Sequence, residues 1–199
     1  MKRLLTVLFL LSLTTAGAQR TTVTGRISRA GDNAPLAGVA VSDGEQVVVS
    51  DSKGNYKLTG RLRDSLVFIS VPSGYKAPAK GVVPQFFARV SGENPTVDFV
   101  LERLPDNTKW RVVVCNDIHL ANRPQKGDIA QFRAGFVADM QRLEPQPGTE
   151  TCIVALGDMT TDKWWYKNRF GLPEYLREME RTGLPVFHCM GNHDHDIRG

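Results

Sequence analysis

The sequence predicts an all-β N-terminal sandwich followed by a truncated α/β domain with a parallel βαβαβ core. Two observations predict this class. Residues 20–103 alternate short apolar runs with Gly, Pro, Asp and Asn and have no helical periodicity, whereas residues 110–199 alternate apolar runs with amphipathic stretches. The length of 199 residues and a composition of 41% hydrophobic and 23% charged residues suit one or two globular domains.

Residues 1–18 have the layout of a cleaved signal peptide. Two basic residues begin the chain, an apolar run follows at 4–13, and small residues occupy 16–18. We expect cleavage to leave Gln19 as the first mature residue, in the periplasm or outside the cell. A membrane anchor is the alternative, but the apolar run is short for a bilayer, so we expect no stable anchor after cleavage.

Charge gives no sign of a nucleic-acid partner. Loss of Lys2 and Arg3 with the leader lowers the formal net charge from +4 to +2. We expect no basic patch with interleaved aromatic residues, and therefore no nucleic-acid binding.

The three cysteines cannot all pair within the chain. Cys115, Cys152 and Cys189 each lie in or at the end of an apolar run, and their spacing fits no CxxC metal motif. We expect three buried thiols that pack as small hydrophobic side chains, with metal binding as the alternative.

The N-terminal segment, 20–103, is expected to form a small antiparallel sandwich. Its apolar runs are separated by Asp43-Gly44 and Lys53-Gly54-Asn55, which are typical turn sequences. Closely spaced short strands of this kind are typical of two packed sheets. The expected strands include 39–41, 46–49, 56–58 and 65–71.

This segment resembles the carboxypeptidase-regulatory-like β-sandwich modules. The resemblance depends on residues 23–27, 35–41 and 50–56. It implies a non-catalytic module, and Asp51 is then either a calcium ligand or, as we expect, a turn residue.

After a linker at 104–109, the segment 110–199 is expected to alternate strands with helices. Apolar residues three and four apart predict a helix over 128–143 with Asp128 as its N-cap, and Gly183 ends the second helix. Strand–helix–strand alternation predicts a parallel sheet. The expected strands are 110–115, 152–156 and 186–190, and the second helix is 173–181.

A polar motif follows each of these three strands. The motifs are Asn116-Asp117-Ile118-His119, Gly157-Asp158 and Gly191-Asn192-His193-Asp194. Because the carboxyl ends of parallel strands share one edge of a sheet, we expect the three motifs to converge there.

The donor types in these motifs indicate a metal centre. Asp117 and His119 are two residues apart, so they point the same way in extended chain. Asp158 adds a carboxylate that can bridge two cations, and Asn192 adds a neutral oxygen. Mixed oxygen and nitrogen donors suit Mn, Fe or Zn. Two such divalent ions can polarise a phosphoryl oxygen and activate water.

This set of motifs resembles the calcineurin-like metallophosphoesterase superfamily over about residues 110–196. The resemblance implies an α/β/β/α fold and hydrolysis of a phosphoester substrate by a metal-bridging hydroxide. It implies that Asp117, His119 and Asp158 hold one metal and that Asp158 and Asn192 hold the second. It also implies that His193 assists the leaving group, and that Asp194 orients His193 through a hydrogen bond.

The chain departs from the family pattern at its end. The family continues with a lone His and a Gly-His-x-His motif, which do not occur before Gly199. We therefore expect a truncated domain with exposed apolar surface and little or no activity of its own. The alternative is an inactive fragment that acts only through its sandwich, as an envelope-binding module.

The remaining histidines and one aromatic run are candidates for structural roles. His188 lies inside a predicted strand and is expected in the core, and His195 with Asp196 is expected in a solvated loop. The aromatic run 164–166 follows the Gly-Asp motif closely. It forms either a wall beside the site or part of the core.

Overall fold

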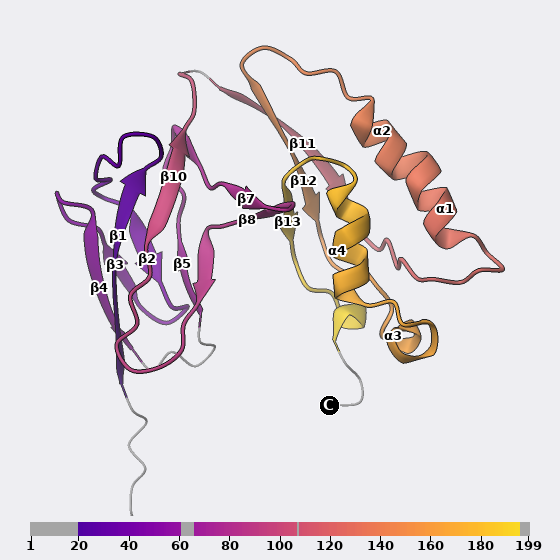
Figure 1. The fold of residues 1–199 in the computed structure, drawn as a ribbon, viewed down its shortest axis with the longest axis horizontal. Coiled ribbons are helices and arrows are strands. Elements are labelled where there is room, and N and C mark those ends of the chain that lie inside the picture. Colours follow the sequence, from indigo (N-terminus) through magenta and orange to yellow (C-terminus); the bar gives the residue numbers. More distant parts are fainter. Residues whose placement is uncertain (1–19, 61–65, 107, 196–199) are drawn as a thin grey trace, which may run out of the picture.

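The computed structural model describes residues 20–60, 66–106 and 108–195. The expected signal peptide lies outside them. Figure 1 shows a β-rich N-terminal part beside a part in which strands alternate with helices, with the β7–β8 hairpin reaching from one to the other. None of the described helices is long and apolar enough to cross a membrane.

The N-terminal part consists of short strands, as the turn-rich sequence predicts. Alternation of buried and exposed residues is clear in Asn55–Gly60, where Tyr56 and Leu58 face inward. The strands are β1 (Thr21–Arg29), β2 (Ala40–Ser42), β3 (Val47–Val49), β4 (Asn55–Gly60), β5 (Leu66–Ile69), β6 (Tyr75–Lys76), β7 (Ala79–Lys80), β8 (Val83–Pro84), β9 (Phe87–Arg89) and β10 (Phe99–Arg103).

Two four-stranded sheets share one hydrophobic core in this part. Their orders are β4-β1-β10-β6 and β3-β2-β5-β9, and buried residues of both sheets form one cluster that includes Ile27, Leu58 and Val67. One pairing differs from the expected antiparallel arrangement, because β1 and β10 run parallel. Side-chain alternation decides which face a residue occupies but not the direction of a neighbouring strand, so the sequence pattern could not reveal this pairing.

Asp51 is a turn residue. Its Oδ1 accepts hydrogen bonds from the backbone N–H groups of Lys53 and Asn55, each at 2.8 Å. These hydrogen bonds close the turn before β4, in agreement with the expectation that Asp51 is a turn residue.

The second part is built on a parallel sheet of order β11-β12-β13. The predicted parallel strand–helix alternation is confirmed in these described residues. The elements are β11 (Lys109–Cys115), α1 (Asp128–Phe132), the π-helical turn η1 (Arg133–Val137), α2 (Ala138–Gln141), β12 (Thr149–Ala155), α3 (Asp162–Asn168), α4 (Leu172–Glu180), β13 (Val186–His188) and the 3-10 turn η2 (Asn192–Asp194).

The first helical stretch begins differently from the prediction. The N-cap is Gly127 in the left-handed conformation, at φ 65°, and Asp128 is the first helical residue. The Asp128 carboxylate accepts hydrogen bonds from the Arg123 guanidinium instead of capping the helix. Glycine adopts this backbone conformation without a steric penalty, which explains why the helix starts there.

The two faces of the sheet differ in their packing. One face packs against α1, η1, α2 and α4 through Val113, Ile153 and Val186. On the other face, the side chains of Val112 and Val114 are 50% and 58% exposed. The expected exposure of apolar surface is therefore confirmed for these residues.

The β7–β8 hairpin joins the two parts. The Val186 N–H of β13 donates to the Val82 carbonyl at 2.7 Å, and Val82 is buried with the core of the α/β part. Lys76 lies 2.9 Å from Glu150, and the rings of Phe86 and Phe187 stack with centroids 6.0 Å apart. The strand that leads to the third motif is thus supported from its outer edge.

The expectation of three buried cysteines is wrong for one of them. Cys152 is buried and Cys115 is half-buried, and this burial raises the pKa of both thiols. Cys189 is exposed, because it follows the last residue of the short strand β13. His188 packs edge-on against Tyr175, as expected for a core residue, and burial lowers its pKa.

Candidate metal centre

The loops after β11 and β12 run side by side beyond the ends of the strands. The Asp117 N–H donates to the Gly157 carbonyl at 3.2 Å, and the His119 N–H donates to the Asp158 carbonyl at 2.9 Å. Leu120 continues the pairing with a bond to Met159 at 3.0 Å. The first two motifs are therefore held together by backbone hydrogen bonds, independently of their side chains.

Three candidate ligands have left-handed backbones. Asp117, His119 and Asp158 have φ angles of 51°, 46° and 48°. The expectation that Asp117 and His119 converge through extended chain is therefore wrong. Their side chains converge because the backbone turns at each residue, a conformation that non-glycine residues adopt at a cost of about 1–3 kcal/mol each.

The side chains of these three residues meet at one point. One potential ligand atom from each lies within 4.8 Å of the others. His119 Nε2 lies 3.9 Å from an oxygen of Asp117 and 3.9 Å from an oxygen of Asp158. Two carboxylates and an imidazole suit a divalent cation such as Mn, Fe or Zn. The residues present therefore fit a metal ion, and the 61% exposure of the Asp117 side chain leaves access from solvent.

The third motif reaches the same point through close backbone contact. The His193 N–H donates to Asp158 Oδ1 at 2.9 Å, and the His119 and His193 rings are 5.1 Å apart at their centroids. A Cβ atom on Gly191 would lie 2.2 Å from the backbone nitrogen of Asp158. A Cβ on Gly157 would lie 2.9 Å from Gly191. The two glycines thus let the second and third loops touch.

Replacing Gly191 by alanine is expected to separate these loops. The φ angle of −98° suits alanine, so the effect is steric alone. We expect a loss of about 2 kcal/mol in the free energy of unfolding, measured by urea denaturation, together with weaker Mn²⁺ binding by calorimetry. Gly135→Ala is the control, since nothing lies within 4 Å of its added methyl group. Equal stability of the two variants would contradict the close contact.

Asp194 does not occupy the expected position. Instead of orienting His193, its buried carboxylate faces the backbone of the two neighbouring loops. It accepts hydrogen bonds from the N–H groups of Met159, Thr160 and Gly191 at 3.2, 2.9 and 3.0 Å, and from the Thr160 hydroxyl at 3.2 Å. Asp194 therefore holds the second and third motifs together through hydrogen bonds to their backbones.

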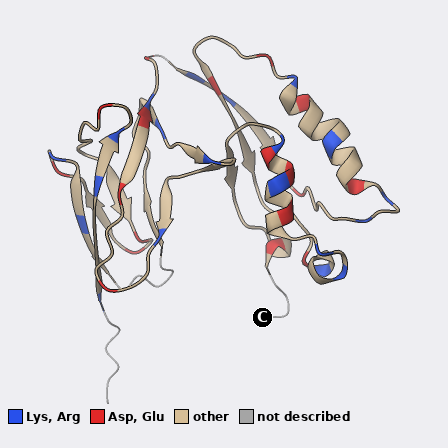
Figure 2. Cartoon of the chain, viewed as in Figure 1, with Lys and Arg blue, Asp and Glu red and all other residues tan. Residues whose placement is uncertain are grey.

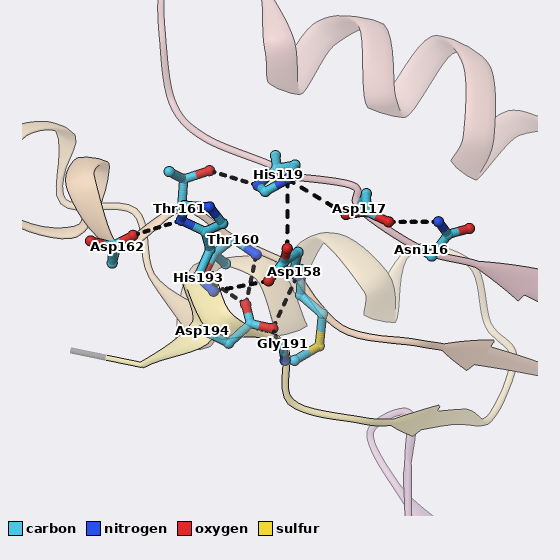
Figure 3. A network of polar contacts seen from close by, with 11 residues as sticks. Asn116, Asp117, His119, Asp158, Thr160, Thr161, Asp162, Gly191, His193 and Asp194 are labelled. Atoms are coloured by element: carbon cyan, nitrogen blue, oxygen red, sulfur yellow. Dashed lines mark hydrogen bonds and ion pairs between the residues drawn. The ribbon is translucent and has the colours of Figure 1, made fainter. Parts of the chain in front are cut away.

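Asp162 takes the role that the sequence suggested for Asp194. Its Oδ1 lies 3.0 Å from His193 Nδ1, a contact visible in Figure 3. This hydrogen bond, more than the charges of Asp158 and Asp194, raises the pKa of His193. Asp162 is the first residue of α3, a helix that the sequence analysis did not predict. An acid one residue after Thr161, where a helix starts, was the available signal.

Thr161 completes the polar network. Its hydroxyl lies 3.2 Å from His119 Nδ1, so His119 Nε2 is the nitrogen that faces Asp117 and Asp158. Asn192, the predicted fourth ligand, is exposed and lies between Gly191 and His193, whose backbones contact Asp158. The role of the Asn192 side chain as a metal ligand stays a prediction.

Comparisons with known protein families give one match for each of the two parts of the chain. Residues 21–104 match a family profile described as the N terminal of calcineurin-like phosphoesterase, and residues 111–199 match the profile of calcineurin-like phosphoesterase. The likeness of the N-terminal part to carboxypeptidase-regulatory-like modules stays a prediction. No curated protein matches the chain.

Among solved structures, the chain is similar to one described as the structure of the streptococcal ancillary pilin. The two share 14% sequence identity with a TM-score of 0.32. The match covers 47% of this chain and 36% of the pilin chain.

Proposed function

The chain belongs to the calcineurin-like phosphoesterase family, whose two profiles cover residues 21–104 and 111–199, and from this premise we propose that it hydrolyses a phosphate ester with two divalent metal ions. We also propose that it acts in the periplasm or outside the cell. The support for export is the signal-peptide pattern of residues 1–18.

The single observation that carries the proposal is the meeting of Asp117, His119 and Asp158. Their potential ligand atoms lie within 4.8 Å of one another at the carboxyl edge of a parallel sheet. The Asp158 carboxylate is the most enclosed of the three, with a side chain only 13% exposed. A carboxylate enclosed between two loops would suit contact with more than one cation, whereas Asp117 at the surface would hold one.

Divalent ions in this site would supply Lewis acidity, which polarises the phosphoryl group and lowers the pKa of a coordinated water. The side chains of the protein position the general acid. Asp162 fixes the His193 ring through Nδ1, which leaves Nε2 free to point toward a substrate oxygen. The raised pKa of His193 favours its protonated form, so it can stabilise negative charge or donate a proton to a leaving alkoxide.

Metal removal tests the proposal. The full gene product, purified with Mn²⁺, is assayed on an aryl phosphate monoester and on a bis-aryl phosphate diester. Chelation followed by dialysis is expected to lower hydrolysis at least about a hundredfold, and added Mn²⁺ should restore it. The intact mass of the same preparation shows whether residues 1–18 have been removed. Full activity in the metal-free protein would contradict the proposed chemistry.

A further inference from the structure

Three cationic side chains gather around one tryptophan beside the candidate metal centre. Lys163 Nζ lies 5.5 Å from the ring centroid of Trp164, and Lys167 Nζ lies 5.0 Å from it. The guanidinium carbon of Arg123 lies 5.9 Å from the same centroid. We name these four residues the Trp164 cluster. Figure 2 shows basic positions, coloured blue, along α3 at the lower edge of the α/β part.

In the described part of the chain, neither lysine of the cluster forms a salt bridge with an acidic side chain. They are exposed and four residues apart on α3, so they occupy the same helix face. Like charges at this spacing oppose helix formation by a few tenths of a kcal/mol. Contact with an aromatic ring offsets part of this repulsion but leaves the positive charge in place.

Arg123 differs from the lysines, because Asp128 neutralises much of its charge. The Arg123 Nε atom donates to Asp128 at 2.5 Å, and a second nitrogen donates at 3.1 Å. This pair fixes the guanidinium beside Trp164. The net positive charge of the cluster therefore lies mainly on Lys163 and Lys167.

The cluster is joined to the metal centre from two directions. Asp162, which contacts His193, directly precedes Lys163 at the start of α3. On the other side, Arg123 and His119 line the same cavity of about 230 Å³. A helix rises about 1.5 Å per residue, so Lys167 lies within roughly 8 Å of the start of α3 along its axis. The positive charge of Lys167 is therefore separated from the start of α3, where Asp162 contacts His193, by about one Debye length at physiological salt.

We propose that the Trp164 cluster binds a second phosphoryl group of the substrate, next to the one that the metal centre hydrolyses. The substrate class is then a small molecule with two linked phosphoryl groups, as in a diphosphate, in place of a simple monoester. The inference rests on the proposed phosphoesterase function. Ammonium groups are common partners of phosphate, and an unneutralised pair beside an anion-processing site also steers anions toward it.

Direct binding tests the inference without any hydrolysis. The chain is stripped of metal, the chelator is removed by dialysis, and inorganic pyrophosphate and orthophosphate are titrated by calorimetry at low ionic strength. We expect pyrophosphate to bind more tightly than orthophosphate. The double variant Lys163→Ala/Lys167→Ala is expected to lose about tenfold in pyrophosphate affinity.

The matched control is Lys53→Ala/Lys57→Ala, which removes two lysines four residues apart from the β-sandwich part. It should leave the pyrophosphate affinity unchanged. An equal loss of pyrophosphate affinity in both double variants would show that only net charge matters, and this would overturn the inference. Unchanged affinity in the α3 variant would also overturn it. Since no metal or turnover is involved, failure of the hydrolysis assay leaves this binding result intact, and the two proposals fail separately.

Discussion

Replacing Asp158 by asparagine is expected to lower kcat/KM of the full gene product about a thousandfold, or roughly 4 kcal/mol of transition-state stabilisation. The substitution removes the charge of the most enclosed donor in the candidate site. The asparagine side-chain oxygen can still accept the hydrogen bond that the His193 N–H makes to Asp158 Oδ1. The effect should therefore fall on metal binding and leave the fold largely intact.

Metal content measured by mass spectrometry accompanies the kinetic assay of this variant. The control is Asp139→Asn, which changes an exposed acid on α2 that pairs only with Arg142 among the described residues. We expect the control to retain activity and metal. Wild-type metal content in Asp158→Asn would rule out the role assigned to this carboxylate.

Asp194→Asn is expected to lower the free energy of unfolding by about 3 kcal/mol. The carboxylate is 2% exposed and accepts four hydrogen bonds from two loops. Asparagine offers one oxygen in place of two, and its amide N–H groups would face backbone donors of Thr160 or Gly191. At least one buried donor then loses its partner. Urea denaturation monitored by tryptophan fluorescence measures the loss.

Asp51→Asn provides the matched comparison for Asp194→Asn. Asp51 also accepts backbone N–H groups in a turn, but it is exposed, so water can replace the lost contacts. Its expected loss is below about 1 kcal/mol. Losses of the same size in the two variants would show that burial adds nothing at Asp194. We also expect weaker Mn²⁺ binding in Asp194→Asn alone, because its two loops carry Asp158 and Asn192.

The convergence of the three motifs could be predicted because it follows from topology. Apolar runs at 110–115 and 152–156 indicate buried strands, and parallel strands bring their carboxyl ends to one edge. The structure places Asp117, His119 and Asp158 at that edge. Their identities and their order along the chain were sufficient for this inference.

The local geometry could not be predicted by the same reasoning. Spacing of two between Asp117 and His119 suggests extended chain, but backbone bonds to Gly157 and Asp158 hold both residues in the left-handed region. The exchange of roles between Asp162 and Asp194 depends on α3, whose seven residues lack a clear apolar period. Because Asp194 is adjacent to His193 in the sequence, it was the expected hydrogen-bond partner. In the structure the partner is Asp162, which reaches His193 through a tertiary contact.

The left-handed backbones of Asp117, His119 and Asp158 have a consequence for ion capture. Their conformations are maintained by backbone hydrogen bonds between neighbouring loops. The conformational entropy of arranging these donors is therefore lost when the chain folds, before an ion arrives. Donors that are preorganised in this way raise the affinity for a cation, because binding then requires little rearrangement of the chain. The strained backbones make the metal-free protein less stable.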